Sequence, residues 1–562
     1  MNRTWLRTLL FAALAVAALS PALAVVSLLA DRYDWRYFEA LGEISRRTVV
    51  WYHQAPLWNP YSCGGEVDLA NPQSLDASPT FLLLLLFGTA FGYKLTFCVY
   101  HFCALDGTFR LARRLGSSAT GATLAAWGYG LSGYLALHFS EGHLTFAGVA
   151  LFPYLLLGFD RALDESEWII PTGLTAAWIV LDGGTFTPPM AAELLLLWAM
   201  VAAIERRSLR PFALLAGAGG VALAVSAVRM LPVLEFIHDH PRPPFMRALD
   251  RSMPWQILGD LIAWREFGPL PGRKYWSHEY AARVPWALLP CVAAAVGALF
   301  RRGAARKIGL VLLLGLLLTM GNFSPVAPWS LLQRLPVLKD LRVPSRHLVL
   351  VVLGASLLAA MGWDVIAARW PRRARLGIAL CVLAALDGTL YTAVQWRKLF
   401  TVVREPPDPP VRFYHTEGNW RSMRDVLWAG HGSLGCDEEA PLQRAEALDP
   451  GDVPQERLLD PAAGQVVSSD WTPNRRTITL DLQRPTVLLI NSNWNEHWKS
   501  EVGRVTQVAG RLAVELPAGR QTVTLRYAPR SFAVGSAVSA LALPLLLGCF
   551  FYRRWRRTST GS

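Results

Sequence analysis

Residues 347–366 read HLVLVVLGASLLAAMGWDVI, and Asp364 is the one Lys, Arg, Asp or Glu among them. A helix of about 20 mainly apolar residues is long enough to cross the hydrocarbon core of a bilayer. Comparable apolar runs recur along the chain, near residues 7–30, 80–112, 118–138, 144–162, 168–182, 189–204, 211–234, 285–300, 308–321, 376–396 and 532–552. We therefore predict a polytopic α-helical membrane protein with about twelve transmembrane helices.

The composition of the 562-residue chain agrees with this class. Hydrophobic residues make up 52% of it and charged residues only 17%, whereas roughly a quarter of the residues of a soluble protein are charged. The high apolar content excludes a disordered chain. Seven cysteines in this length are too few for a small scaffold held by disulfides.

The excess of basic residues is distributed as a topology signal. The chain has 55 Lys and Arg against 42 Asp and Glu, a net charge of +13. The arginines cluster at the ends of apolar runs, on every second connection: Arg3 and Arg7; Arg110, Arg113 and Arg114; Arg206, Arg207 and Arg210; Arg301, Arg302, Arg306 and Lys307; Arg369, Arg372, Arg373 and Arg375; Arg553, Arg554, Arg556 and Arg557. The positive-inside rule predicts this pattern for cytoplasmic loops. We therefore place both termini in the cytoplasm and exclude a nucleic-acid partner.

Two of the apolar runs need a closer interpretation. Gly88 and Gly92 interrupt residues 80–112, which are too many for one span, so we predict a short interfacial or re-entrant helix that leads into a true span. The first run resembles a signal peptide with an Ala22-Leu23-Ala24 cleavage site. It continues beyond the usual length of a signal-peptide core, so we favour an uncleaved anchor. The downstream topology is the same in either case.

The connections on the other side of the membrane are long and rich in Trp, Tyr, His and Pro. Residues 1–396 are predicted to form a transmembrane module with extracytoplasmic loops 31–79, 235–284 and 322–346. Residues 532–562 supply the last transmembrane helix and a basic cytoplasmic tail. Because the cytoplasmic connections are short, any chemistry is expected on the extracytoplasmic side.

Residues 397–531 have a soluble composition and are predicted to form an extracytoplasmic, mostly β domain. Apolar and polar residues alternate over residues 477–482, 487–490, 512–516 and 522–527, and Pro517-Ala518-Gly519 supplies a turn. Alternation of period two between turn signals is typical of a small antiparallel sheet or sandwich. Spans on both sides would anchor this domain above the membrane.

Cys63 and Cys436 are the two cysteines that this topology places outside the membrane. In an oxidising compartment they could form a disulfide between the first loop and the β domain. Two unpaired thiols remain an equal alternative, because a sequence does not define the separation of their Cα atoms.

The first loop begins with Asp31-Arg32-Tyr33-Asp34-Trp35. A carboxylate held where a span meets an aqueous cavity can be partly desolvated, and desolvation makes it a stronger general base. The alternative is an interfacial carboxylate that caps the following helix. The cap is favoured for Asp31, and both interpretations stay open for Asp34.

Several segments together resemble a known family. They are the first-loop Asp with Pro56-Leu57-Trp58-Asn59-Pro60, then Ser140-Glu141-Gly142-His143-Leu144, Leu341-Arg342-Val343-Pro344-Ser345-Arg346, and the closing Arg526-Tyr527-Ala528-Pro529. Over nearly the whole chain, this set resembles the bacterial YfhO family, which is similar to the GT-C glycosyltransferase superfamily. The chain departs from the family pattern at Asn495-Glu496-His497-Trp498, where a Pro-Gly-Trp-like turn is expected, and it has no Asp-x-Asp motif.

The resemblance implies a GT-C-like fold and a membrane glycosyltransferase. Such an enzyme takes a sugar from a polyprenyl-phosphate-linked donor on the extracytoplasmic side. An acidic residue of the first loop acts on the acceptor, and Asp34 occupies that position here. The implied partners are the polyprenyl-phosphate-sugar lipid, the membrane, and an acceptor that is a glycan, a glycolipid or an envelope polymer.

Transfer from such a donor also needs cations for the departing phosphate. Arg342, Arg346 and His347 stand at the mouth of a span, and the fork of an Arg side chain matches two phosphate oxygens. The alternative for Arg346 is snorkelling at the interface. Further cations lie in loop 235–284, where solvated surface is the favoured interpretation: Arg265, Arg273, Lys274 and His278.

Other candidates are assigned to the acceptor or to orientation of the site. Glu141 and His143 lie between two spans, and Asp182 lies in a turn-like Leu181-Asp182-Gly183-Gly184; an ordinary polar turn is the alternative for each. Trp58 and the neighbouring Asn59 could contact a sugar, although Trp also forms interfacial belts. No metal site is assigned, no cofactor is predicted, and a divalent cation is left open.

Two other classes of function compete with the transferase. No Walker loop, dinucleotide fingerprint or zincin helix occurs in the sequence, which argues against ATP-driven transport and metalloprotease chemistry. A flippase or carrier of lipid-linked sugars would place charges inside its spans or show internal repeats. A non-catalytic glycan-binding protein of envelope assembly would need no first-loop carboxylate.

Overall fold

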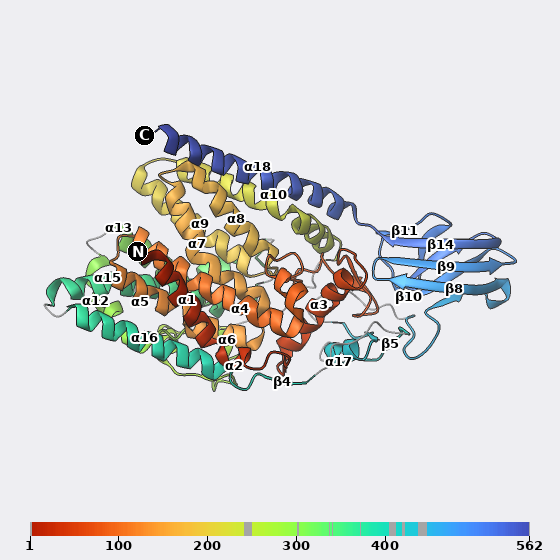
Figure 1. Cartoon of the computed structure of the whole chain (residues 1–562), viewed down its shortest axis with the longest axis horizontal. Coiled ribbons are helices and arrows are strands. Elements are labelled where there is room, and N and C mark those ends of the chain that lie inside the picture. Colours follow the sequence, from red (N-terminus) through yellow and green to blue (C-terminus); the bar gives the residue numbers. More distant parts are fainter. Residues whose placement is uncertain are drawn as a thin grey trace.

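The computed structural model describes residues 3–240, 250–299, 303–335, 338–339, 341–370, 373–403, 412–418, 422–436 and 447–560. A large helical part carries a β sandwich at one end (Figure 1). The first helices are α1 Arg3–Ala18, α2 Ser20–Leu23, α3 Tyr33–Val50, α4 Phe81–Arg114, α5 Ala119–Gly130, α6 Gly133–Glu141, η1 Leu144–Leu151, α7 Phe152–Ala162, η2 Ser166–Trp168, α8 Ile169–Leu181, α9 Thr187–Arg206 and α10 Arg210–Asp239. The later ones are α11 Pro254–Ile262, η3 Ser277–Tyr280, η4 Trp286–Leu288, α12 Leu289–Leu299, α13 Gly303–Thr319, α14 Pro328–Leu332, η5 Pro344–His347, α15 Leu348–Arg369, α16 Arg373–Trp396, α17 Met423–Trp428 and α18 Arg530–Thr560.

The structure confirms a multi-pass helical membrane protein but does not establish twelve spans. Within the described residues, 7 helical segments are long and apolar enough to cross a membrane: Phe81–Arg114, Leu144–Ala162, Thr187–Arg206, Arg210–Asp239, Pro344–Arg369, Arg373–Trp396 and Arg530–Arg556. Three shorter apolar helical segments are Thr4–Ala18, Ser166–Leu181 and Trp286–Val296. The predicted span at 118–138 is divided between α5 and α6. Each of these two helices is too short to cross alone.

Helix α15, which contains most of the apolar stretch quoted first, lies in the core of the helical part. All its residues from Leu348 to Trp363 are buried, and it packs against α5, α12 and α13. A Cβ atom on Gly362 would lie 1.7 Å from the carbonyl oxygen of Cys291 in α12. The glycine therefore lets two helix backbones approach closely, as small residues do in membrane bundles.

Helix α4 is broken where the sequence predicts an interruption. Gly88 has a φ of 76° and a ψ of 166°, which are not helical values. Glycine adopts a positive φ without steric penalty. The short segment from Phe81 therefore meets the longer helix at an angle set by Gly88.

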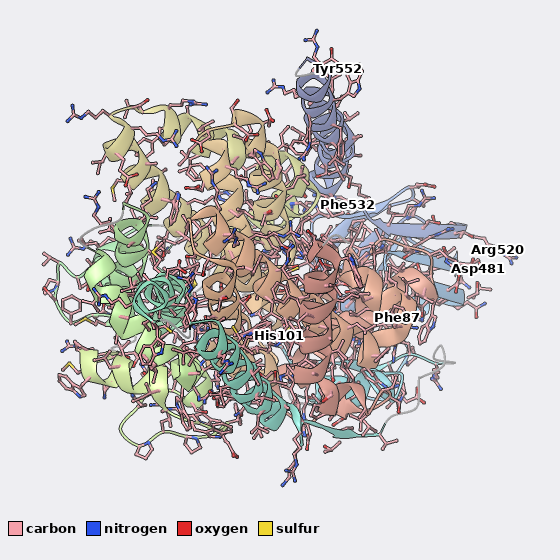
Figure 2. The ribbon with its side chains drawn as sticks, turned by 60° about the vertical axis from the view of Figure 1, so that its left-hand side comes forward. Phe87, His101, Asp481, Arg520, Phe532 and Tyr552 are labelled. Carbon is pink, nitrogen blue, oxygen red and sulfur yellow. A yellow bond between two sulfur atoms is a disulfide. The ribbon has the colours of Figure 1, made fainter. Side chains whose placement is uncertain are left out.

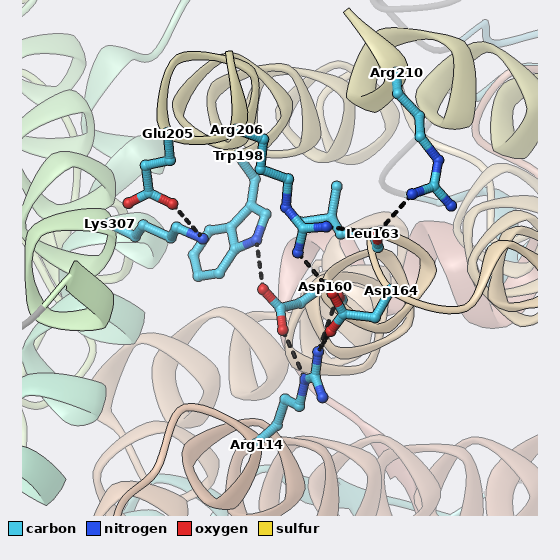
Figure 3. A network of polar contacts seen from close by, with 9 residues as sticks. All are labelled: Arg114, Asp160, Leu163, Asp164, Trp198, Glu205, Arg206, Arg210 and Lys307. Atoms are coloured by element: carbon cyan, nitrogen blue, oxygen red, sulfur yellow. Dashed lines mark hydrogen bonds and ion pairs between the residues drawn. The ribbon is translucent and has the colours of Figure 1, made fainter. Parts of the chain in front are cut away.

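Ion pairs join the helices at the end of the bundle where arginines cluster (Figure 3). Arg114 of α4 binds Asp160 of α7 at 2.8 Å, and the Trp198 indole N–H donates to the same carboxylate at 3.2 Å. Lys307 of α13 pairs with Glu205 of α9 at 2.9 Å. These contacts tie α4, α7, α9 and α13 together at this end.

The β region is confirmed as two antiparallel four-stranded sheets, in the orders β12-β13-β10-β7 and β11-β14-β9-β8. The strands are β7 Glu456–Leu458, β8 Gly464–Thr472, β9 Arg475–Leu482, β10 Thr486–Asn493, β11 Trp498–Ser500, β12 Arg504–Val508, β13 Arg511–Leu516 and β14 Gly519–Tyr527. Shorter strands elsewhere are β1 Leu29–Ala30, β2 Trp58–Asn59, β3 Glu66–Val67, β4 Phe400–Val402, β5 His415–Thr416 and β6 Gly432–Ser433. Trp58 and Val67 of the first loop complete the core of the sandwich.

A disulfide fastens the first loop to the segment after α16. The sulfur atoms of Cys63 and Cys436 are bonded, with their Cα atoms 4.4 Å apart and a sequence separation of 373. Nearby, Arg424 of α17 pairs with Glu39 of α3 at 2.6 Å, and both side chains are buried. The structure thus selects the bridge from the two alternatives that the sequence leaves open.

Candidate active site

The site forms where the start of α3 meets the turn between α6 and η1. Gly142 in this turn has a φ of +97°, and a Cβ atom on it would lie 2.6 Å from the backbone nitrogen of Trp35. Asp34 is the acidic residue in the first turn of α3. The close approach that Gly142 permits brings Asp34 beside His143.

Asp34 is held by a pair of histidines. Its Oδ2 lies 3.1 Å from Nε2 of His143, and the Asp34 side chain is 37% exposed while that of His143 is 8% exposed. Nδ1 of His143 lies 2.8 Å from Nδ1 of the buried His138. If His138 donates at this contact, His143 accepts there and carries its own proton on Nε2, facing Asp34. The pair then orients the carboxylate and leaves part of it open to solvent.

Glu141 is a second carboxyl group beside Asp34. Burial, together with the negative charge of Asp34, raises the pKa of Glu141 to about 9, although Arg32 opposes this. Arg32 donates from Nη1 to the carbonyl oxygen of Ser140 at 3.0 Å, and its guanidinium lies 4.2 Å from the centre of the Phe267 ring. Glu141 therefore holds a proton at neutral pH.

Near His143, η3 contributes His278 and Glu279. Arg346 donates to Glu279 from Nη2 at 2.6 Å and from Nε at 3.0 Å. Burial alone would raise the pKa of Glu279, but the Arg346 guanidinium lowers it well below its usual range. Burial and the nearby His143 lower the pKa of His278 to about 4. Arg346 also lies over Phe146 at 4.6 Å, measured to the ring centre.

The remaining donor-side candidates have separate surroundings. His347 Nε2 lies 3.0 Å from Oε2 of Glu193, so this imidazole points toward α9. Arg342 and Arg346 are both close enough to Tyr275 to act on its hydroxyl electrostatically. Of the loop cations, Arg273 pairs with Asp260 at 2.9 Å. Arg265 pairs with the same Asp260 at 2.5 Å, and Lys274 is exposed.

The acceptor-side candidates do not all gather at Asp34. Trp58 packs against Trp498 and Tyr527 of the β sandwich, with ring centres 5.5 and 4.9 Å away. Asn59 donates to Ser62 at 3.0 Å within the first loop. The structure brings Asp34, Glu141, His143 and Arg346 into one neighbourhood, and places Trp58 and Asn59 at the seam with the β domain.

Asp182 and Asp31 also lie in other contacts. Asp182 is buried and accepts a hydrogen bond of 2.6 Å from Ser78. Asp31 pairs with Arg36 at the start of α3 and is about half exposed, with 47% of its side chain accessible.

Sequence reasoning did not select Arg32, His138 or Glu279. Arg32 is two residues before Asp34, and Glu279 directly follows His278, so adjacency to a chosen residue was an available signal for both. His138 gave no such signal, because it stands within an apolar run. Its partner His143 comes near it only when α6 ends at the left-handed Gly142.

Part of this cluster has the donor atoms of a metal site. His143, His278 and Glu279 each offer one ligand atom, and these atoms lie within 4.8 Å of one another. The fit is incomplete because both oxygens of Glu279 already bind Arg346, whose positive charge would repel an added cation. A divalent cation would therefore need Asp34 as its anionic ligand.

No protein-family model matches this chain, and no curated protein matches it either. Membrane glycosyltransferases of known structure are similar to it. For arabinofuranosyltransferase AftD from Mycobacteria, the identity is 16% and the TM-score 0.46, over 71% of this chain and 27% of AftD. For ArnT from Cupriavidus metallidurans, bound to undecaprenyl phosphate, the values are 14% and 0.48, over 78% of this chain and 87% of ArnT.

The oligosaccharyltransferase of Archaeoglobus fulgidus is 11% identical with a TM-score of 0.44, over 78% of this chain and 65% of the archaeal protein. The chain thus spans about a quarter of AftD and most of ArnT. The YfhO family is not shown by any of these matches. Likeness at this level does not identify a reaction, which has to be argued from the residues of the site.

Proposed function

We propose that this protein is a membrane glycosyltransferase, with a polyprenyl-phosphate-linked sugar as donor and a hydroxyl group of a cell-envelope molecule as acceptor. The observation that carries the proposal is the partly exposed Asp34 carboxylate, held 3.1 Å from His143 beside the buried Glu141. A carboxylate that is oriented by one neighbour and open on its other side can accept a proton from a bound hydroxyl. The cytoplasmic membrane of a bacterium is the proposed location, with this site on the extracytoplasmic side.

In the proposed reaction, the acceptor oxygen forms a bond to the anomeric carbon of the donor sugar. The bond from that carbon to the phosphate oxygen breaks, and the polyprenyl phosphate leaves with the electron pair. The proton of the acceptor hydroxyl goes to Asp34, and His143 keeps the carboxylate turned toward the acceptor. Positioned proton transfer of this kind contributes typically about 10²–10⁴ in rate.

Arg346 and Arg342 are proposed to bind the donor phosphate. The Arg346 side chain is only 13% exposed, and its guanidinium packs against Phe146 and Phe186. These contacts favour a role inside the protein over snorkelling at the interface. Glu279 fixes the plane of the Arg346 fork, which would present Arg346 to phosphate oxygens in one orientation.

The other candidates are proposed to position the site. Trp58 joins the first loop to the β domain, and Asn59 braces the same loop. His347 is proposed to fix the start of α15 through Glu193. Asp182 would hold the segment around Ser78 next to η1.

Replacement of Asp34 by Asn tests the proposal. The substitution keeps the size of the side chain and removes the proton acceptor, so turnover should fall by roughly 10²–10⁴ while donor binding is little changed. Asp31→Asn is the matched control, because Asp31 lies three residues away and pairs with Arg36; its effect should be mild. The measurement is transfer of labelled sugar by purified protein in detergent, with an acceptor chosen by comparing the glycolipids of cells with and without the gene.

Full activity of the Asn variant would contradict the assignment of Asp34. Movement of lipid-linked sugar across vesicles containing the protein, without any new glycosidic bond, would instead establish a carrier. Glycan binding that is unaffected by Asp34→Asn, without transfer, would establish a non-catalytic envelope protein.

A further inference from the structure

A cavity lies at the junction between the helical part and the β sandwich. It has a volume of about 330 Å³ and lies between the end of α10, the connection from β10 to β11, and the first turn of α18. Phe532, which lines it, marks the place where α18 begins beside the sheets (Figure 2). The proposed transferase reaction uses no residue of this cavity.

The charge of the cavity is opposite to that of the chain. Three carboxylates and two imidazoles line it: Glu235, Asp239, Glu496, His240 and His497. No Lys or Arg is among the described residues of its wall, although the whole chain carries a net charge of +13. Uncompensated carboxylates in a recess favour a cation.

Three of these side chains converge on one point. His497 Nε2 lies 3.3 Å from Glu235 Oε2 and 3.9 Å from Glu496 Oε1. One ligand atom from each of the three residues lies within 4.8 Å of the others. An imidazole and two carboxylates supply nitrogen and oxygen donors that zinc accepts, with bonds of about 2.0–2.2 Å.

Neighbouring groups hold these ligands in place. The backbone N–H of His497 donates to Asn495 Oδ1 at 3.0 Å, and the carbonyl of His497 accepts from Ala528 at 3.1 Å. Ser531 of α18 donates to Glu235 Oε2. Hydrogen bonds of this kind around a metal site orient its ligands.

A buried phenol lies at the same wall: Tyr527 is 4% exposed and lines the cavity.

We propose that Glu235, Glu496 and His497 bind a divalent cation of the zinc class, and that this ion ties the membrane helix α10 to the β sandwich. Glu496 and His497 belong to the segment Asn495-Glu496-His497-Trp498. Two of the ligands stand in that segment, at the end of the domain that faces α10.

The test measures how many zinc ions bind to the untagged full-length protein in detergent, after a chelator has removed any bound metal. Calorimetric titration with zinc chloride and elemental analysis should show one ion per chain at this site, and zinc should raise the temperature of unfolding. The variants Glu235→Gln and His497→Gln should each bind one zinc ion fewer, and zinc should no longer raise their temperature of unfolding. Glu501→Gln is the matched control, because Glu501 is an exposed carboxylate of the same domain, 3.6 Å from Arg526, and should change neither.

The number of bound zinc ions also distinguishes this site from the cluster around His143. If that cluster binds zinc too, the wild-type protein holds two ions and the His497 variant one. Equal zinc stoichiometry and affinity in the wild type and both variants would overturn the proposal, as would absence of zinc binding at micromolar concentrations. If Glu235→Gln or His497→Gln changes the temperature of unfolding before zinc is added, Glu496→Gln replaces that variant in the same comparison. If the metal-free protein binds a cationic amino sugar but not zinc, the cavity recognises a sugar and the metal-site proposal is overturned.

Discussion

Glu141 keeps its proton at neutral pH in a site where Asp34 is proposed to take one up. Its pKa is about 9 in the folded protein, against an ordinary value of 4.5. Between these two values the native state binds one more proton than the unfolded state. The free energy of unfolding should therefore be highest below the ordinary value and fall as the pH rises toward 9.

Glu141→Gln should remove this pH dependence, because the amide cannot ionise. In the wild type, the contribution of Glu141 should reach at most about 1.4 kcal/mol per pH unit, and the variant should lose that slope and be the more stable of the two at alkaline pH. Unfolding in detergent at a series of pH values measures it, with Glu501→Gln as a control at an exposed position. Parallel curves for the wild type and Glu141→Gln would show that Glu141 is ionised in the folded state.

The proposed role of Arg346 in donor binding can be tested separately from its neutralisation of Glu279. Arg346→Ala leaves Glu279 buried without its partner, so this variant is expected to be unstable. The double variant Arg346→Ala with Glu279→Gln restores neutrality and should fold. It should still bind donor about ten- to a hundredfold more weakly, which corresponds to the loss of a hydrogen bond to a charged group.

Arg346→Lys should lie between these cases, because Lys keeps the charge and loses the fork. The measurement is the donor KM alongside kcat for each variant. Recovery of wild-type donor KM in the double variant would mean that Arg346 serves only to neutralise Glu279.

At this scale, the sequence identified residues whose spacing is local and missed those that depend on tertiary contacts. Asp34 was selected because its segment directly follows the first predicted span, and His143 because it lies between two predicted spans. Glu279 became part of the site only through Arg346, which lies 67 residues later. No periodicity in a single sequence encodes that pairing.

Among the elements, the turn at Gly142 is where an added methyl group should act directly on the candidate active site. Gly142→Ala introduces a Cβ atom 2.6 Å from the backbone of Trp35 and must displace α3 from the α6–η1 turn. Turnover should fall by roughly 10², since a displacement of about 1 Å is enough to misplace a catalytic group.

Gly116→Ala is the matched control for this substitution. Gly116 also has a positive φ, +90°, but a Cβ atom on it would meet nothing within 4 Å. It should show only the penalty of the left-handed backbone, about 1–2 kcal/mol, with turnover retained in the folded fraction. Equal turnover of the two variants would show that the contact with Trp35 does not position Asp34.

The β strands were easier to predict than the helices. The alternation over residues 477–482 and 522–527 falls within β9 and β14, because one face of each strand packs into the core. The predicted span at 118–138 was less accurate. Its apolarity is real, but the chain turns at Ser132, whose hydroxyl accepts from Leu135 to begin α6, and hydrophobicity alone does not reveal such a break.

For the molecule as a whole, the side of the membrane that each loop occupies remains a prediction of the arginine pattern. Ala55, Lys274 and Ser468 are exposed and belong to the loops 31–79, 235–284 and 397–531. Changed singly to Cys in a Cys549→Ser background, each should react with an impermeant thiol reagent in intact cells. Ser208→Cys, exposed at the opposite end of α9, should react only after the cells are opened. Protection of any of the first three would overturn the predicted topology.

The bridge between Cys63 and Cys436 also determines the order of events in biogenesis. Cys63 is synthesised early, and 373 further residues up to and including Cys436 follow it, among them every helix from α4 to α17. Until Cys436 is synthesised, the Cys63 thiol can undergo exchange with other disulfides. The loop that carries Asp34 is therefore locked among the last events of assembly. In a partly inserted chain, the disulfide would not yet hold the loop that carries the proposed base Asp34. Activity would therefore begin only when the protein is complete.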